Sequence, residues 1–199
     1  MKRLFAVSGV MLLFFACSSE PEKTLSPVVA EKTLIEEVKE RTDKNPKDAE
    51  AWLYLADLYD REAMYQEEIT ALNKVIDADP DKKSVYLNLG NTYSRLGRYQ
   101  DAIANYQKAI HSFPRNPVLY NNLGVAYGKI GKIDEEIGSF KKAISLRTRY
   151  ATARFNLGMA LLKKGRRDLA LQQYHELNTF DNGVAESLKK EIDAKEKKP

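Results

Sequence analysis

Apolar and polar positions repeat along this chain with a period of 34 residues. The stretch "NLGNTYSRLG" begins at residue 88, and it returns as "NLGVAYGKIG" at 122, as "NLGMALLKKG" at 156 and, more loosely, as "YLADLYDREA" at 54. Each period contains two helical runs with a turn between them, which is typical of stacked helix–turn–helix units. We therefore predict four such units, at residues 49–82, 83–116, 117–150 and 151–184.

Two sets of glycines recur at fixed places in these units. Glycine inside a helix costs about 1 kcal/mol relative to alanine, so its repeated use at one helical phase indicates a close contact. We expect this contact between the two helices of each unit, at Gly90, Gly124 and Gly158. The second set is expected where the first helix of a unit ends and the chain turns, at Gly97, Gly131 and Gly165.

Further helices are predicted at both ends of the repeats. Leu34 and Val38 lie on one helical face, which predicts an N-terminal helix in the segment 31–48 that covers the first unit. Val184, Leu188 and Ile192 predict a capping helix in the segment 185–199, with its apolar side inward. A two-helix unit cannot bury its apolar face alone, so stacked neighbours and these end helices complete the core.

The units resemble the tetratricopeptide repeat, whose motif places leucine, glycine, aromatic residues and proline at fixed positions of a 34-residue unit. The positions that carry the resemblance are 7 (Leu55, Leu89, Leu123, Leu157), 8 (Ala56, Gly90, Gly124, Gly158), 11 (Tyr59, Tyr93, Tyr127) and 32 (Pro80, Pro114). The resemblance implies an all-α fold, a right-handed α-solenoid whose first helices line a concave groove. Glu68 and Glu136 stand where the motif has alanine, and we expect their carboxylates to reach water.

The N-terminus is typical of an export signal. Lys2 and Arg3 precede an apolar run at residues 4–16, which is too short to span a bilayer. The stretch "FFAC" resembles the lipobox of bacterial lipoproteins, with Phe14 where that family has leucine. This resemblance implies a signal peptide at 1–16 and lipidation of Cys17. An ordinary signal peptide with an incidental cysteine is the alternative.

Residues 17–30 are interpreted as the lipidated cysteine and a flexible tether, because they contain two prolines and no helical stripe. By the sorting convention of such lipoproteins, Ser18 after the cysteine implies the outer membrane, with the protein facing the periplasm. A secreted or soluble periplasmic protein is the alternative location.

Composition and charge narrow the function classes. The net charge is +4, but Lys2 and Arg3 belong to the expected signal, so the remaining charge is too balanced to indicate nucleic acid. His111 and His175 are far apart and are expected to face solvent, and no motif for nucleophilic, metal or phosphate chemistry is present. We therefore expect no enzyme activity, no cofactor, no metal and no small-molecule substrate.

The expected groove gives the candidate site residues. Three asparagines and a tyrosine share one groove position, and cationic side chains share another; these residues are Tyr54, Asn88, Asn122 and Asn156, with Asn91 beside them, and Arg95, Lys129 and Lys163. The amides are candidates for pairing with an extended peptide backbone, and the cations for an acidic segment. The alternatives are a consensus asparagine without a contact and a solvated basic edge.

The expected groove has two further features. The set of lysines, asparagines and an arginine with which some relatives bind a C-terminal carboxylate is not matched, since Glu50 and Tyr54 stand at its first positions. Phe155, Met159 and Leu162 form an apolar patch that either holds a partner segment or lies under the capping helix.

The function expected from these features is a non-catalytic scaffold or adaptor that binds a protein segment and is anchored to the envelope through Cys17. A pilotin-like assembly factor for a secretin or type IV pilus, and a scaffold for cell-wall enzymes, are both consistent with the sequence. A self-assembling structural protein is a further alternative.

Overall fold

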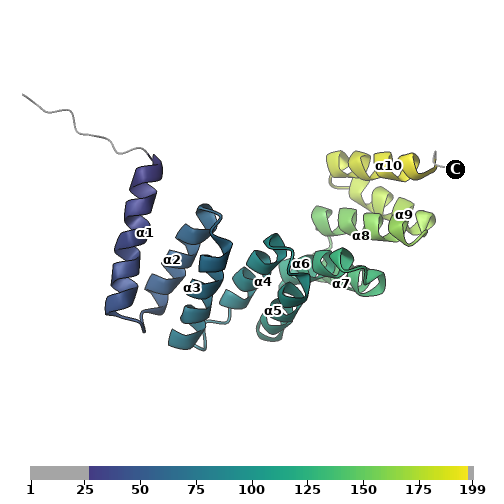
Figure 1. Cartoon of the computed structure of the whole chain (residues 1–199). Helices are drawn as coiled ribbons and strands as arrows, with labels where there is room; N and C mark the ends of the chain where they lie inside the picture. Colours follow the sequence, from purple (N-terminus) through teal and green to yellow (C-terminus); the bar gives the residue numbers. More distant parts are fainter. Residues whose placement is uncertain (1–26, 197–199) are drawn as a thin grey trace, which may run out of the picture.

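The computed structural model describes residues 27–196, and all regular structure in that range is helical (Figure 1). The helices are α1 (Pro27–Lys44), α2 (Ala49–Arg61), α3 (Tyr65–Ala78), α4 (Val85–Arg95), α5 (Tyr99–Ser112), α6 (Pro117–Lys129), α7 (Ile133–Leu146), α8 (Ala151–Lys163), α9 (Arg167–Asn178) and α10 (Asn182–Glu196). The predicted signal peptide, Cys17 and the first part of the predicted tether lie outside the described residues.

The helices follow one another as antiparallel pairs in a curved array, with α1 at one end and α10 at the other (Figure 1). The pairs α2–α3, α4–α5, α6–α7 and α8–α9 correspond to the four sequence periods. The prediction of an all-α solenoid is thereby confirmed.

Local sequence explains where these helices begin and end. The side chain of Asp48 accepts a hydrogen bond from the Ala51 amide at 2.9 Å and so caps α2. Gly97, Gly131 and Gly165 follow the ends of α4, α6 and α8 with φ of 72°, 79° and 77°. In this left-handed region glycine meets no Cβ penalty, so these residues terminate the first helix of the second, third and fourth pairs, as the sequence predicted.

Close packing inside the pairs depends on the other set of glycines. A Cβ on Gly90 would lie 2.5 Å from the Tyr106 ring, and one on Gly124 would lie 2.7 Å from the Phe140 ring. Both aromatic side chains come from the second helix of the same unit and are almost fully buried. The expected contact within the unit is present at both positions.

Gly158 differs from this expectation. A Cβ there would lie 2.6 Å from Leu188, which belongs to α10 and not to the partner helix α9. Leu188, Ala185 and Ile192 are completely buried in the last core cluster. The capping helix therefore fills the space that an aromatic residue fills in the earlier units.

Both end helices begin earlier than predicted. The helix α1 starts at Pro27, so the tether interpretation was wrong for residues 27–30. Proline is favoured at the first helical position, because its missing amide proton would have no partner there. The helix α10 starts at Asn182, and Asp181 accepts a hydrogen bond from the Val184 amide at 3.1 Å.

Candidate binding groove

Three adjoining pockets follow the first helices of the units, and together they form what we call the groove. The first pocket lies between α2, α3 and α4, the second between α4, α5 and α6, and the third between α6, α7 and α8. Asn91 and Arg95 line both the first and the second pocket, and Val125 lines both the second and the third. The groove is therefore continuous along the array.

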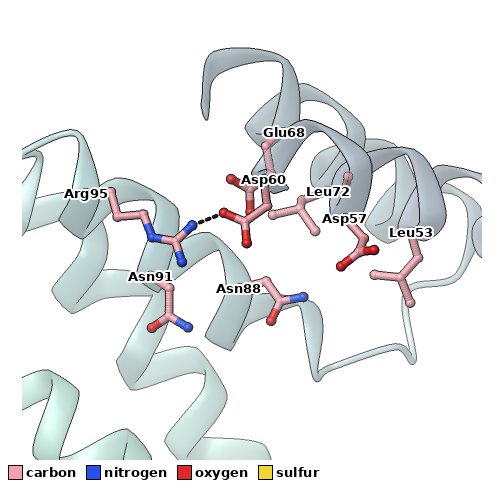
Figure 2. Close-up of a pocket in the computed structure, with 9 residues that line it drawn as sticks. Leu53, Asp57, Asp60, Glu68, Leu72, Asn88, Asn91 and Arg95 are labelled. Carbon is pink, nitrogen blue, oxygen red and sulfur yellow. Dashed lines mark ion pairs between the residues drawn. The ribbon is translucent and has the colours of Figure 1, made fainter. Parts of the chain in front are cut away.

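The first pocket has a volume of about 320 Å³ and contains three carboxylates (Figure 2). Its lining residues are Leu53, Ala56, Asp57, Asp60, Glu68, Leu72, Asn88, Asn91 and Arg95. Asp60 pairs with Arg95 across the pocket. Asp57 pairs with Arg61, which lies one helical turn further along α2, at 2.5 Å.

Glu68 is the buried acid of this pocket. Its exposed fraction is 5%, so the expectation that its carboxylate reaches water was wrong. One carboxylate oxygen accepts a hydrogen bond from the Thr92 hydroxyl at 2.7 Å, and the other, Oε2, has no hydrogen-bond partner among the described residues. Burial raises the pKa of Glu68, the Thr92 hydrogen bond lowers it, and the nearby Asp57 raises it further.

The second pocket, of about 250 Å³, is formed around asparagine side chains. Asn91 Oδ1 accepts hydrogen bonds from Asn122 Nδ2 at 3.0 Å and from the Tyr106 hydroxyl at 2.9 Å. Asn156 Nδ2 donates to Asn121 Oδ1 at 3.1 Å, and Asn121 Nδ2 donates to Asn122 Oδ1 at 3.3 Å. These amides thus connect α4, α6 and α8 to one another, which sequence analysis did not anticipate.

Asn88 stands apart from this network. It is exposed, lines the first pocket, and its side-chain amide makes no hydrogen bond within the described part of the chain. Tyr54, at the equivalent place on α2, is 41% exposed. In the predicted asparagine row, the side-chain amide of Asn88 is therefore available to bind a ligand, whereas Asn122 and Asn156 already donate hydrogen bonds to neighbouring units.

The predicted basic row is largely paired inside the protein. Arg95 pairs with Asp60 and lies 5.6 Å above the Tyr65 ring centroid. Lys163 donates to the Gly128 carbonyl at 3.2 Å and lies 3.7 Å from a Glu136 carboxylate oxygen. Lys129 is exposed. Two of the three cations therefore join successive units, which leaves little positive charge for an acidic segment.

The third pocket, of about 280 Å³, combines apolar side chains with Lys129, Glu136 and Asn156. Val125, Phe140 and Met159 line it, and Val125 is 39% exposed. Burial raises the pKa of Glu136, while Lys163 lowers it. In the apolar patch predicted on α8, Leu162 is buried in the core cluster that includes α10, whereas Phe155 and Met159 are only partly buried.

The polarity of the groove changes from one end to the other. At one repeat position the successive first helices carry Asp57, Asn91, Val125 and Met159. Three positions later they carry Asp60, Ser94, Gly128 and Leu162. At these two positions the groove is acidic between the first two units and apolar between the last two, although Lys129 and Glu136 also line the third pocket. Of these residues only Asn91, Met159 and Leu162 were predicted from the sequence to lie in the groove, and the gradient was missed, although comparing the same position in successive 34-residue units would have revealed it.

Residues 27–196 lack the features of a metal site and of a membrane-spanning helix. No group of three histidine, cysteine or acidic side chains in this range is arranged to hold a metal ion. His111 and His175 are both exposed. None of the helices described here combines the length and apolar character needed to cross a bilayer.

Comparison with protein families finds one repeat family. Models described as tetratricopeptide repeat match residues 29–83, 71–104 and 118–150, and a model described as TPR repeat matches residues 90–131. These overlapping matches extend together over residues 29–150. No curated protein matches the chain significantly.

Several solved structures are similar to this one over most of their length. A crystal structure of MamA protein has a TM-score of 0.71 at 25% identity, with 85% of this chain and 88% of that chain covered. MamA from Desulfovibrio magneticus RS-1 has a TM-score of 0.70 at 17% identity, covering 81% and 87%. YrrB, described as a TPR protein with an unusual peptide-binding site, has a TM-score of 0.64 at 24% identity, covering 81% and 87%.

Proposed function

The chain belongs to the tetratricopeptide repeat family, a family of protein-interaction scaffolds, and we propose that it binds a segment of a partner protein in the groove without catalysing a reaction. The observation that carries the proposal is the continuity of the three pockets. The first and second pockets share Asn91 and Arg95, and the second and third share Val125. A continuous channel over three pairs of units fits an extended polypeptide better than a compact small molecule. YrrB has the same fold and is described as having a peptide-binding site, which supports peptide binding as the use of the groove.

A matched pair of substitutions tests whether the groove is the binding surface. Val125 and Leu169 are 39% and 40% exposed, but Val125 lines two pockets of the groove, whereas Leu169 lies on α9. We expect Val125→Arg to abolish affinity capture of partner proteins from solubilised envelopes by the full-length protein. Leu169→Arg should capture them as wild type does.

Thermal melts followed by circular dichroism control for unfolding of either variant. Since both side chains are exposed, we expect both melts to stay close to wild type. Equal capture by the wild type and by Val125→Arg would contradict the use of the groove.

We also propose that the protein is anchored to the bacterial outer membrane through Cys17. The support is sequence-based: two basic residues, an apolar run at 4–16 and Ala16 directly before the chain's one cysteine. Labelled palmitate should enter the wild-type protein and should be lost in Cys17→Ser. Equal labelling of both would contradict the anchor and favour a protein that is soluble in the periplasm.

A further inference from the structure

The first pocket of the groove has the composition of a receptor for one cationic side chain. It is lined by the carboxylates of Asp57, Asp60 and Glu68, and by a single cation, Arg95. Arg95 already pairs with Asp60. Asp57 pairs with Arg61, which does not line the pocket, so the acids of the lining still outnumber its cation.

Glu68 gives this negative pocket an unsatisfied acceptor. Only 5% of the surface of this residue is exposed, and Oε2 has no hydrogen-bond partner within residues 27–196. A buried carboxylate oxygen without a partner is costly, and such atoms in folded proteins usually mark a missing partner. Oε2 itself is buried, but Glu68 lines the pocket, so a rotation of its side chain would present this oxygen to a donor that enters the pocket.

The equivalent acid two units later has a cation beside it, at ion-pair distance although its Oε2 accepts no hydrogen bond among the described residues. Glu136 stands at the same repeat position as Glu68, and Lys163 Nζ lies 3.7 Å from its Oε2. In the first pair of units the residue at the place of Lys163 is Arg95, whose guanidinium is turned to Asp60 instead. The protein therefore supplies an internal cation to Glu136 but leaves Glu68 without one.

The walls of the pocket fit the rest of a basic side chain. Leu53 and Leu72 contribute apolar surface beside the carboxylates (Figure 2), and Ala56 also lines the pocket. Lysine and arginine carry an apolar stem and a charged head, so they bury the stem against such walls while the head reaches the acids. The exposed amide of Asn88 lies on α4 at the same pocket, where it can bond the backbone of the segment that carries the side chain.

We propose that the partner segment inserts a lysine or arginine side chain into the first pocket, where its head binds Glu68 and Asp57, while apolar residues of the same segment contact Val125 and Met159. This inference rests on the proposed function, since it names the chemistry of the segment bound in the groove. It reverses the sequence-based suggestion of an acidic partner, because Arg95 and Lys163 of the basic row are paired internally, whereas Glu68 in the first pocket has no cation beside it.

The test uses a library of random dodecapeptides displayed on phage, selected on the full-length protein in detergent. Selected peptides are synthesised, and each is compared with an analogue in which lysine is replaced by norleucine or arginine by citrulline. Both replacements keep the stem and remove the charge. We expect the neutral analogue to bind wild type at least about tenfold more weakly, since a charged hydrogen bond to a buried acid is lost.

Substitutions in the protein locate the effect. Glu68→Gln keeps the shape of the side chain and an acceptor for Thr92, and it should remove most of the preference for the charged peptide over its neutral analogue. Glu136→Gln makes the same change at the equivalent position, where Lys163 already pairs with the acid, and it should leave that preference intact. Thermal melts of both variants control for folding.

The outcomes separate this inference from the function on which it rests. In one outcome, the selected peptides fail to bind Val125→Arg, but their affinity changes neither with the charge of the peptide nor with Glu68→Gln. This outcome would overturn the basic-side-chain inference and keep the groove as the binding surface. Peptides that bind Val125→Arg and wild type equally, with no dependence on Glu68, would overturn both. A preference for the charged peptide that persists in Glu68→Gln would also overturn the inference.

Discussion

Individual units of this protein differ from the repeat pattern at single residues. Three of the four units end their first helix on a glycine with positive φ, but the first unit has Ala63 at that place, with φ of 55°. A Cβ in this region crowds the backbone and costs roughly 1–2 kcal/mol. The first unit is therefore strained at a position where its sister units are not.

Ala63→Gly should relieve this strain. We expect the free energy of unfolding to rise by about 0.5–1 kcal/mol, because the relief exceeds the entropy that glycine adds to the unfolded chain. Urea denaturation provides the measurement. The reverse change, Gly131→Ala, should destabilise, and since no atom lies within 4 Å of its Cβ position, that loss would come from the backbone alone. A loss of stability in Ala63→Gly would contradict the strain.

The buried acid of the first pocket predicts a pH dependence of stability. Burial raises the pKa of Glu68 in the folded protein above its ordinary value of 4.5, with Thr92 lowering it and Asp57 raising it. Asp60 and Arg95, which pair with each other, complete the charges that line the pocket. Between the unfolded and the folded pKa the folded state holds more protons, so stability contributed by this group falls as pH rises through that window.

Glu68→Gln removes this titration. We expect the variant to be more stable than wild type at pH 7, and we expect the difference to shrink below pH 4.5, where the wild-type acid is protonated in both states. Denaturation curves at several pH values measure the difference. A variant that is less stable than wild type at pH 7 would show that the carboxylate is stabilised by a partner.

At the scale of helices, two glycines offer opposite outcomes for the same substitution. A Cβ on Gly124 of α6 would lie 2.7 Å from the buried Phe140 ring, whereas Gly138 of α7 has no atom within 4 Å of its Cβ position. Gly124→Ala should lower stability by about 1–3 kcal/mol through overpacking. Gly138→Ala should raise it by up to about 1 kcal/mol through helix propensity.

Thermal melts of the two variants, compared with wild type, measure both effects. Shifts in the same direction would contradict the role assigned to the close contact between α6 and α7. The comparison is sharp because both positions are interior to a helix and both substitutions add one methyl group.

Much of the architecture at this scale could be predicted from the sequence. The 34-residue period located the helix pairs, and the recurring glycines located the turns and the contacts of Gly90 with Tyr106 and of Gly124 with Phe140. The contact of Gly158 with Leu188 could not be predicted in this way, because the capping helix lies outside the repeat and no register relates it to α8. The start of α1 was missed because Pro27 was taken as a loop residue, although proline also favours a first helical position.

The candidate site was less predictable than the fold. The period placed Asn88, Asn122 and Asn156 at one helical phase, but whether an amide is available to a ligand depends on distances between units. Those distances bring Asn122 within 3.0 Å of Asn91 and leave Asn88 without such a partner. The same holds for Glu68, whose burial follows from how closely α3 approaches α4 and not from its own sequence neighbours.

The whole molecule presents a groove with two chemically different ends. Asp57 and Glu68 line its first pocket, and Val125 and Met159 line its third. A partner segment with a basic residue at one end and apolar residues at the other therefore matches the groove best in one direction. This direction is set by the array as a whole, since the three acids of the first pocket and Met159 belong to different units.

This placement can be measured by photo-crosslinking. A benzophenone residue next to the basic side chain of a selected peptide should react with the first unit, near Tyr54, which is exposed beside the acidic pocket. The same group placed at the apolar end should react with α8, near Met159, whose thioether and methyl groups are good targets. Mass spectrometry of the digested adducts identifies the sites.

Moving the basic residue to the other end of the peptide should exchange the two patterns, because the acids of the first pocket attract the charge wherever it stands in the peptide. Adducts distributed equally over both ends for either peptide would mean that polarity does not orient the bound segment, and binding would then rest on backbone contacts such as the amide of Asn88.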